Sequence, residues 1–281
     1  LPFNPNTTDL PIRDIIPAVR EHLTAANTLI VNAPPGAGKS TVLPLALLEE
    51  AWLAGQKIVM LEPRRLAART IAERLAQLLG EPVGQTVGYR IRFETRISEQ
   101  TRLEVVTEGI LTRMIHSDRS LSGIGLVIFD EFHERSIHAD VAMALCREAQ
   151  QTLRPDLRIM VMSATLDMPQ LTQLLRAPVA QSMGRQYPVE LIYTGEADSF
   201  LLPELTTRTV LRALREKQGD VLVFLPGEGD IKKVEALLRK QTREVAIHPL
   251  FGKLPPNKQF AAIMPGRDGK RKVVLATSIA E

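Results

Sequence analysis

The chain has 281 residues, 44% of them hydrophobic and 24% charged, which is ordinary for a globular protein and enough for two domains. No apolar run is long enough to predict a membrane span, and the first residues lack the pattern of a secretory signal. A single cysteine, Cys146, excludes an internal disulfide, so a reducing cytoplasm is the expected compartment. With a net charge of +3, the chain is not strongly basic overall. Because its aromatic content is only 4%, base stacking is not expected to be its main way of binding a nucleic acid.

Apolar, β-rich runs alternate with helix-like segments through the first two thirds of the chain. The runs predict buried parallel strands at residues 29–34, 57–63, 103–109, 125–131 and 158–165. Helices are expected between them, notably at 41–55 and at 65–80, where Gly80 and then Pro82 give a helix stop. Alternating strands and helices predict an α/β fold with a parallel sheet and right-handed crossovers.

A second series of the same kind follows. Strands are expected at residues 189–194, 220–227, 244–250 and 272–278, and helices at 202–219 and 229–241. A linker near residues 183–190 therefore predicts two domains, residues 1–187 and residues 188–281. Because the sequence stops just after its last expected strand, we expect the second domain to be incomplete.

Residues 33–41 read APPGAGKST and lie between an expected strand and an apolar helix, which is the context of a phosphate-binding P-loop. Glycines allow the backbone to wrap around phosphates, and successive N–H groups at a helix start point at the anion. Lys39 would reach the β- and γ-phosphates of ATP, and Ser40 would ligate Mg²⁺. The predicted nucleotide-binding residues of this loop are Pro35, Gly36, Ala37, Gly38, Lys39, Ser40 and Thr41.

Two carboxylates, Asp130 and Glu131, end the strand expected at 125–131. Ligands of open α/β sheets bind at the carboxyl ends of the strands, so Asp130 and Glu131 are both predicted for the Mg²⁺ site, Asp130 to hold the ion and Glu131 to act also as general base. A zinc-protease helix is the rival interpretation of this region. It needs histidines four residues apart, whereas His133 and His138 are five apart, which excludes it.

An ordered set of motifs resembles the DEAH/RHA group of superfamily 2 helicases. Motif I is resembled by residues 33–41, motif Ia by 62–69, motif Ib by 107–114, motif II by 130–136 and motif III by 163–165. Residues 87–94 are similar to a stretch typical of DEAH proteins. Residues 221–231 resemble motif IV, and 273–281 the opening of motif V. The set covers nearly the whole chain and looks most like the bacterial HrpB-type helicases, with Phe132 in place of the alanine of the DEAH box.

The resemblance implies two RecA-like P-loop NTPase domains that use ATP to move along single-stranded RNA, with DNA possible. Catalysis is implied for Lys39, Asp130, Glu131 and His133, the last coupling the nucleotide site to the second domain. Ser163 and Thr165 would link hydrolysis to nucleic-acid binding. Backbone contacts are implied for Arg64, Arg65, Thr107, Glu108, Gly109 and Thr277, and adenine contacts for Arg74 and for Ile263, which replaces the usual phenylalanine.

The other arginines, including Arg90, Arg92, Arg96 and Arg102, are expected to be plain surface charge. No arginine-rich motif VI follows motif V, so we expect this chain alone to bind nucleotide but to hydrolyse it poorly. An ATP-dependent switch that moves a protein partner uses the same core and stays open as an alternative; the partner is not predictable. A passive RNA-binding module with a vestigial ATP site is disfavoured by the intact Lys39, Asp130 and Glu131.

Overall fold

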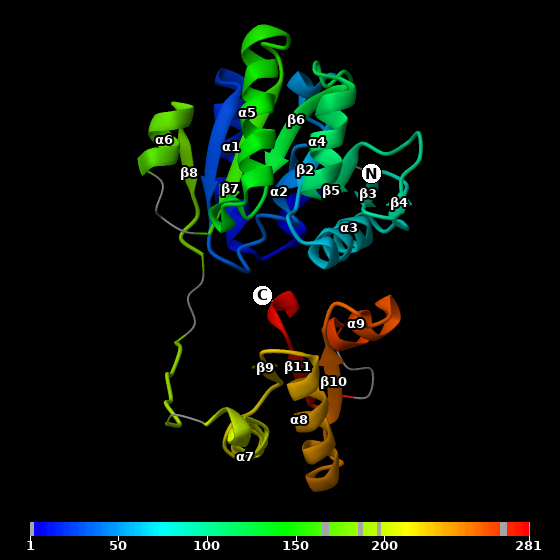
Figure 1. Cartoon of the computed structure of the whole chain (residues 1–281). Helices are drawn as coiled ribbons and strands as arrows, with labels where there is room; N and C mark the ends of the chain where they lie inside the picture. The colour runs from blue at the N-terminus through cyan, green and yellow to red at the C-terminus, as the bar shows by residue number, and fades with distance from the viewer. Residues whose placement is uncertain (1–2, 165–168, 185–187, 196–197, 265–268, 281) are drawn as a thin grey trace. The chain divides into compact units, whose positions relative to one another are not determined.

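The chain forms two compact units, Leu1–Tyr187 and Pro188–Glu281 (Figure 1). The computed structural model describes residues 3–164, 169–184, 188–195, 198–264 and 269–280. Within these residues, no helix is long and apolar enough to cross a membrane. Short 3₁₀ turns lie at Pro5–Thr7, Pro11–Ile15, Ala51–Leu53, Phe132–Glu134, Ser199–Leu201 and Ser278–Ala280.

The first unit is built on an eight-stranded sheet in the order β4-β3-β5-β2-β6-β7-β1-β8. Neighbouring strands are parallel except for the antiparallel pair β3 and β4. The strands are β1 Thr28–Asn32, β2 Lys57–Leu61, β3 Val87–Ile91, β4 Glu94–Arg96, β5 Leu103–Val106, β6 Ile124–Phe129, β7 Arg158–Ser163 and β8 Val179–Gln181.

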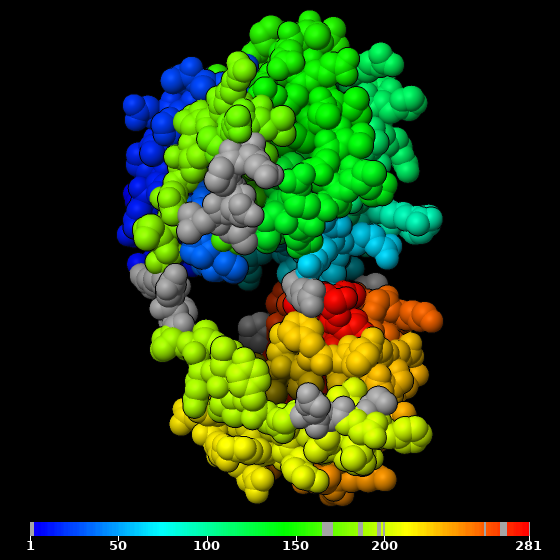
Figure 2. All heavy atoms as spheres, turned by 60° about the vertical axis from the view of Figure 1, so that its left-hand side comes forward, coloured from blue at the N-terminus to red at the C-terminus, as the bar shows by residue number. Residues whose placement is uncertain are grey.

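Helices cover both faces of this sheet and make two apolar cores. Helices α1 (Ile16–Ala25), α2 (Leu43–Ala46) and α3 (Arg65–Leu79) pack on one face, and α4 (Glu108–Ser117), α5 (Ile137–Thr152) and α6 (Pro169–Leu175) on the other. Successive strand residues feed opposite cores, as Leu29 and Ile30 do. Because both faces are buried, the strands read as continuous apolar runs, and the predicted α/β parallel fold is confirmed. Figure 2 shows the light-green segment with α6 and β8 on the outer surface of this unit.

Helix α3 matches its prediction, whereas the helix expected at 41–55 does not. Helix α3 ends at Gly80, whose φ of 73° suits a left-handed cap. The other segment contains only the short α2 and a 3₁₀ turn. Pro44 has no N–H to give, and the next bonds are tight i→i−3 turns, such as Leu47 N to the carbonyl of Pro44 at 3.3 Å. Residues 42–48 are buried on all sides, so packing decides their conformation.

The second unit holds a three-stranded parallel sheet in the order β10-β11-β9 among its described residues. Its strands are β9 Val221–Phe224, β10 Ala246–Leu250 and β11 Lys272–Ala276, and its helices are α7 Leu202–Glu216, α8 Glu228–Gln241 and α9 Pro256–Ile263. The core joins Val210, Ile231, Val234 and Leu238 to Val273 and Leu275.

The strand expected at 189–194 is wrong. Residues 188–195 have no regular structure, and Val189 and Tyr193 are 82% and 90% exposed. A β-rich composition makes a strand only where a neighbour accepts its backbone hydrogen bonds, and no described strand pairs with this segment. The strand β9 is also less buried than a central strand, since Leu222 and Phe224 are each 51% exposed.

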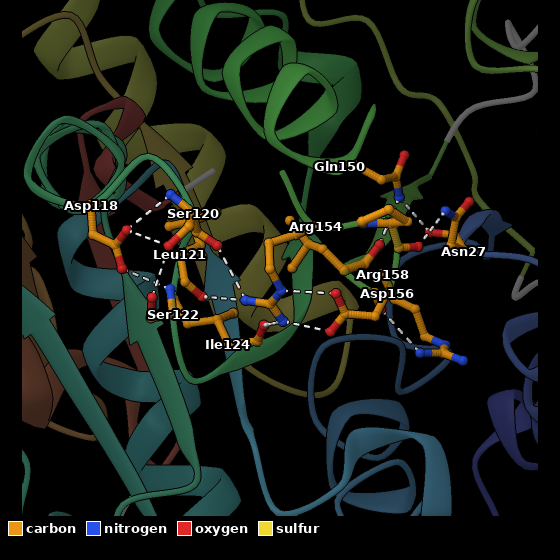
Figure 3. Close-up of polar contacts among 12 residues, drawn as sticks. Asn27, Asp118, Ser120, Leu121, Ser122, Ile124, Gln150, Arg154, Asp156 and Arg158 are labelled. Carbon is orange, nitrogen blue, oxygen red and sulfur yellow. Dashed lines mark hydrogen bonds and ion pairs between the residues drawn. The ribbon is translucent and has the colours of Figure 1, made fainter. Parts of the chain in front are cut away.

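A polar network at the amino ends of β6 and β7 closes the edge of the first sheet opposite the P-loop (Figure 3). Arg154 donates to the carbonyls of Ser120, Leu121 and Ile124 at 3.1, 3.2 and 3.2 Å. Its guanidinium also binds Asp156 at 2.7 Å. The arginine therefore ties the loop before β6 to the loop between α5 and β7.

Candidate active site

The P-loop follows β1 at the carboxyl edge of the first sheet. Gly36 and Gly38 have φ of 77° and 95°, a conformation that side chains rarely adopt. A Cβ on Gly38 would lie 3.0 Å from both Leu10 Cδ1 and Ile12 Cγ2. The backbone N–H of Ile12 donates to the carbonyl of Ala37 at 2.9 Å. The N-terminal segment therefore packs against the loop and fixes its shape.

Lys39 lies under this loop and is 5% exposed. Its Nζ is 2.5 Å from Oε1 of Glu131, which follows β6. In the sheet, β7 separates β6 from β1, so the ion pair spans the carboxyl ends of three strands. The carboxylate of Glu131 thus forms an ion pair with the lysine that is expected to bind the phosphates.

Asp130 is 2% exposed and lies beside this pair. Burial, together with the neighbouring Glu131, raises the pKa of its carboxyl to about 6, against the lowering effects of Lys39 and of a hydrogen bond from Ser40. Oδ1 accepts the backbone N–H of Glu131 at 2.9 Å, whereas Oδ2 is buried without a hydrogen-bond partner among the described residues.

This orphaned oxygen and the Ser40 hydroxyl fit Mg²⁺. The ion prefers oxygen ligands and is usually held by one or two carboxylates together with water and phosphate oxygens. In the described part of the chain, no group of three or more His, Cys, Asp or Glu is placed to hold a metal. Mg²⁺ does not require such a group, because water and phosphate oxygens supply its other ligands. Asp130 and Ser40 would therefore hold the ion, with Glu131 next to it.

The turn after Asp130 is strained. Glu131 and Arg135 have left-handed backbones with φ of 48° and 50°, and the 3₁₀ turn Phe132–Glu134 lies between them. Such residues cost about 1–3 kcal/mol each, and they cluster where function over-determines the backbone. Phe132 is 6% exposed and anchors the turn, with its ring 6.0 Å from that of Phe129 at an interplanar angle of 84°.

His133 lies between the general-base candidate and the end of β7. Its Nδ1 is 3.3 Å from Oε2 of Glu131 and 3.4 Å from the backbone nitrogen of Ala164. The nitrogen donates to Glu131 when it carries a proton and accepts from Ala164 when it does not, so it serves one at a time. Ser163 is 2% exposed at the end of β7, and Thr165 lies outside the described residues.

Glu62 is a carboxylate at this site that the sequence reasoning missed. Leu61 pairs with Phe129 across β2 and β6, so Glu62 and Asp130 leave the sheet side by side. Glu62 is 2% exposed, and burial and then Asp130 raise its pKa to about 8, although the N–H of Arg64 donates to it at 3.3 Å. The signal was available, because Glu62 follows an apolar strand just as Asp130 does.

Motif Ia lies at the same edge of the sheet, after β2. Arg64 is half-buried and its guanidinium is 3.0 Å from Oε1 of Glu134. Arg65 is exposed at the first residue of α3. Arg74 is exposed further along α3, and its guanidinium donates to Gln77 of the same helix at 2.8 Å, so its adenine contact stays a prediction.

Motif Ib follows β5 at this edge as well. Thr107 is 7% exposed and precedes α4, and Gly109 is exposed with open space around it. The carboxylate of Glu108 accepts a hydrogen bond from the hydroxyl of Ser136. Motifs Ia and Ib are thus placed beside the turn that carries Glu131.

Two predicted residues belong to the second unit. Ile263, in α9, is 38% exposed. Thr277 follows β11, and its N–H donates to the carbonyl of Leu250 at 3.2 Å. Their contacts with adenine and with nucleic acid stay predictions.

The expectation of plain surface charge is wrong for Arg90. This half-buried residue of β3 is ion-paired with Glu104, which is 1% exposed and also lies 3.0 Å from Lys57. The sequence does not reveal this pair, because Arg90 and Glu104 lie on different strands and become neighbours only through the pairing of β3 with β5. His138 is exposed, as expected for a surface residue.

Known proteins match this arrangement over most of the chain. Residues 13–174 match the DEAD/DEAH box helicase family. The chain is 50% identical over 276 residues to the ATP-dependent RNA helicase HrpB of Escherichia coli (strain K12), a match that covers 98% of this chain and 34% of that protein.

Two solved structures agree with this match. The crystal structure of Escherichia coli DEAH/RHA helicase HrpB superposes with a TM-score of 0.89 and 49% identity over 97% of this chain and 35% of that one. The structure described as E. coli DExH-box NTPase HrpB gives 0.77 and 48%, over 97% and 34%. The chain therefore spans about a third of the length of these relatives and shares their RecA-like fold. With the family matched over residues 13–174, the chain belongs to the DEAD/DEAH box helicases.

Proposed function

We propose that this chain is part of an ATP-dependent helicase or translocase that acts on single-stranded RNA and hydrolyses ATP to ADP and phosphate. The observation that carries the proposal is the ion pair of Lys39 with Glu131, beside the buried Asp130, at the carboxyl edge of a parallel sheet. Residues 1–187 would be the ATP-binding RecA-like domain, and residues 188–281 part of a second one.

Each residue of this cluster has a distinct task. Lys39 would bind the β- and γ-phosphates, and Asp130 with Ser40 would hold Mg²⁺, which supplies neutralisation of phosphate charge. Glu131 would take the proton of the attacking water. When phosphates engage Lys39, they displace Glu131 from it, so the same event binds the substrate and frees the base.

Nucleic acid would be held mainly through its backbone. Arg64 and Arg65 offer guanidinium groups to phosphates, and Gly109 leaves open space at the start of α4, where a sugar-phosphate backbone could approach. Recognition would therefore be independent of sequence. The preference for RNA over DNA rests on the name of the HrpB relative.

The experiment is steady-state ATP hydrolysis by the purified full-length protein of which this chain is part, with and without single-stranded RNA, with DNA of the same sequence, and with Lys39→Ala as the blank. A several-fold rise with RNA supports the translocase. Turnover that is real but indifferent to both nucleic acids contradicts it and favours the alternative, an ATP-dependent switch that remodels a protein or RNA–protein partner without unwinding.

A further inference from the structure

The six residues Glu131–Ser136, called the motif II turn below, contact four separate segments. Glu131 pairs with Lys39 of the P-loop, and His133 reaches Ala164 after β7. Glu134 pairs with Arg64 of motif Ia, and Ser136 donates to Glu108 of motif Ib. The turn therefore links the nucleotide site directly to both segments that are proposed to contact the nucleic-acid backbone.

Among these contacts, the pair of Arg64 with Glu134 is the one that a nucleic acid could exchange. Both side chains are about one third exposed, 32% and 31%, and their atoms are 3.0 Å apart. Ion pairs at this exposure are weak, so a competitor displaces them readily. A phosphate of the backbone offers the guanidinium two oxygens and a stronger, bidentate contact.

The turn can transmit that exchange to the general-base candidate. The N–H of Glu134 donates to the carbonyl of Glu131 at 2.9 Å, so the two residues close a single 3₁₀ turn. The backbone of Glu131 is left-handed, a conformation that persists only while its surroundings enforce it. Freeing the side chain of Glu134 removes one of those constraints.

We propose that Glu134 is a positioning residue that restrains Arg64 until a sugar-phosphate backbone takes the arginine away. Loss of the Arg64–Glu134 pair loosens the motif II turn, so that Glu131, once the ATP phosphates have displaced it from Lys39, can move to the attacking water. Strand binding and ATP turnover are thereby coupled through one exchangeable ion pair. This inference rests on the proposed function and adds the device that would make turnover depend on the strand.

The test is Glu134→Gln, which keeps the size of the side chain and removes its charge. We expect turnover without nucleic acid to rise, and the concentration of single-stranded RNA for half-maximal stimulation to fall about two- to five-fold. Turnover at saturating RNA should stay within about two-fold of the wild type, because the phosphate has already displaced Glu134 there. A merely structural residue would instead lower turnover at every RNA concentration.

Asp140→Asn is the matched control. It removes an ion pair of 3.2 Å with Arg135, which is in the same turn, but this pair does not lead to motif Ia. We expect its basal turnover and its RNA dependence to match the wild type. Anisotropy of a labelled strand, measured without nucleotide, repeats the comparison without catalysis, and Glu134→Gln should bind more tightly there too.

The outcomes separate the two proposals. If RNA and DNA both leave wild-type turnover unchanged, the proposed function fails and this inference fails with it. If the wild type is stimulated but Glu134→Gln has the same basal turnover and half-maximal RNA concentration as Asp140→Asn, only this inference is overturned. Thermal unfolding of both variants within a few degrees of the wild type guards against a folding defect, and Glu134→Asp, which restores the charge, should move both values back toward the wild type.

Discussion

The ammonium group of Lys39 lies 2.5 Å from the carboxylate of Glu131, so the residue expected to hold phosphate is paired with the residue expected to activate water. Lys39 is almost fully buried, and an unpaired charge there would be costly. The pair therefore stabilises the cluster without nucleotide. It also keeps Lys39 from its expected phosphates and Glu131 from its expected water until a phosphate displaces the carboxylate.

Glu131→Gln should separate binding from hydrolysis. The amide cannot take a proton from water, so we expect ATP turnover to fall by about 10²–10⁴-fold. Nucleotide affinity, measured by titration with a fluorescent ATP analogue, should be unchanged or higher, because Lys39 no longer has a charged competitor. Lys39→Ala is the control and should lose both binding and turnover. Weaker binding by Glu131→Gln would contradict the competition between carboxylate and phosphate.

The two P-loop glycines should respond differently to alanine. Both have positive φ, so each substitution costs about 1–2 kcal/mol of backbone strain. The space at Gly36 is open, whereas a Cβ on Gly38 meets Leu10 and Ile12 at 3.0 Å and adds about 1–3 kcal/mol of overpacking. The free energy of unfolding, measured with urea, should therefore be lower for Gly38→Ala than for Gly36→Ala. Equal losses would show that the N-terminal segment gives way without cost.

Much of this site was predictable because its signals are local. The P-loop and Asp130 each follow an apolar strand, and the parallel sheet brings strand ends to one edge without further information. The cap at Gly80 is also local, since glycine adopts its left-handed backbone without strain.

What the sequence did not reveal depends on partners far along the chain. The roles of Glu62 and Glu134 depend on which strand neighbours β2 and on how the strained turn after Asp130 bends. The pairing of Arg90 with Glu104 needs the order of β3 and β5. The segment 189–194 shows the converse, because its β-rich composition does not supply the neighbouring strand that it needs.

Glu62 should make stability depend on pH. Its pKa is raised from 4.5 to about 8, so the folded chain binds its proton across this interval and the unfolded chain does not. Stability from this group is complete below pH 4.5 and is lost as pH rises toward 8, by up to about 1.4 kcal/mol per pH unit.

Glu62→Gln replaces the titratable carboxyl group with an uncharged amide of similar size and shape. We expect its free energy of unfolding, from urea titrations between pH 5 and 9, to fall less with pH than that of the wild type. The pKa of Asp130 is also raised, to about 6, so part of the slope below that pH should remain in both proteins. Parallel curves for the two proteins would show that Glu62 is already ionised in the folded state.

Arg154 should stabilise the fold without serving the site. Its side chain is 15% exposed and its guanidinium holds three backbone carbonyls, which Arg154→Ala would leave without this donor (Figure 3). We expect the free energy of unfolding to fall by about 2–3 kcal/mol. Asp156→Asn, at a residue whose side chain is 57% exposed, should cost under about 1 kcal/mol, because it removes only the solvated half of the network.

Affinity for the fluorescent nucleotide should be unchanged in both variants, since the network lies at the amino ends of β6 and β7 and the P-loop at the carboxyl end of β1. Weakened nucleotide binding in a folded Arg154→Ala protein would contradict this separation of stability from function.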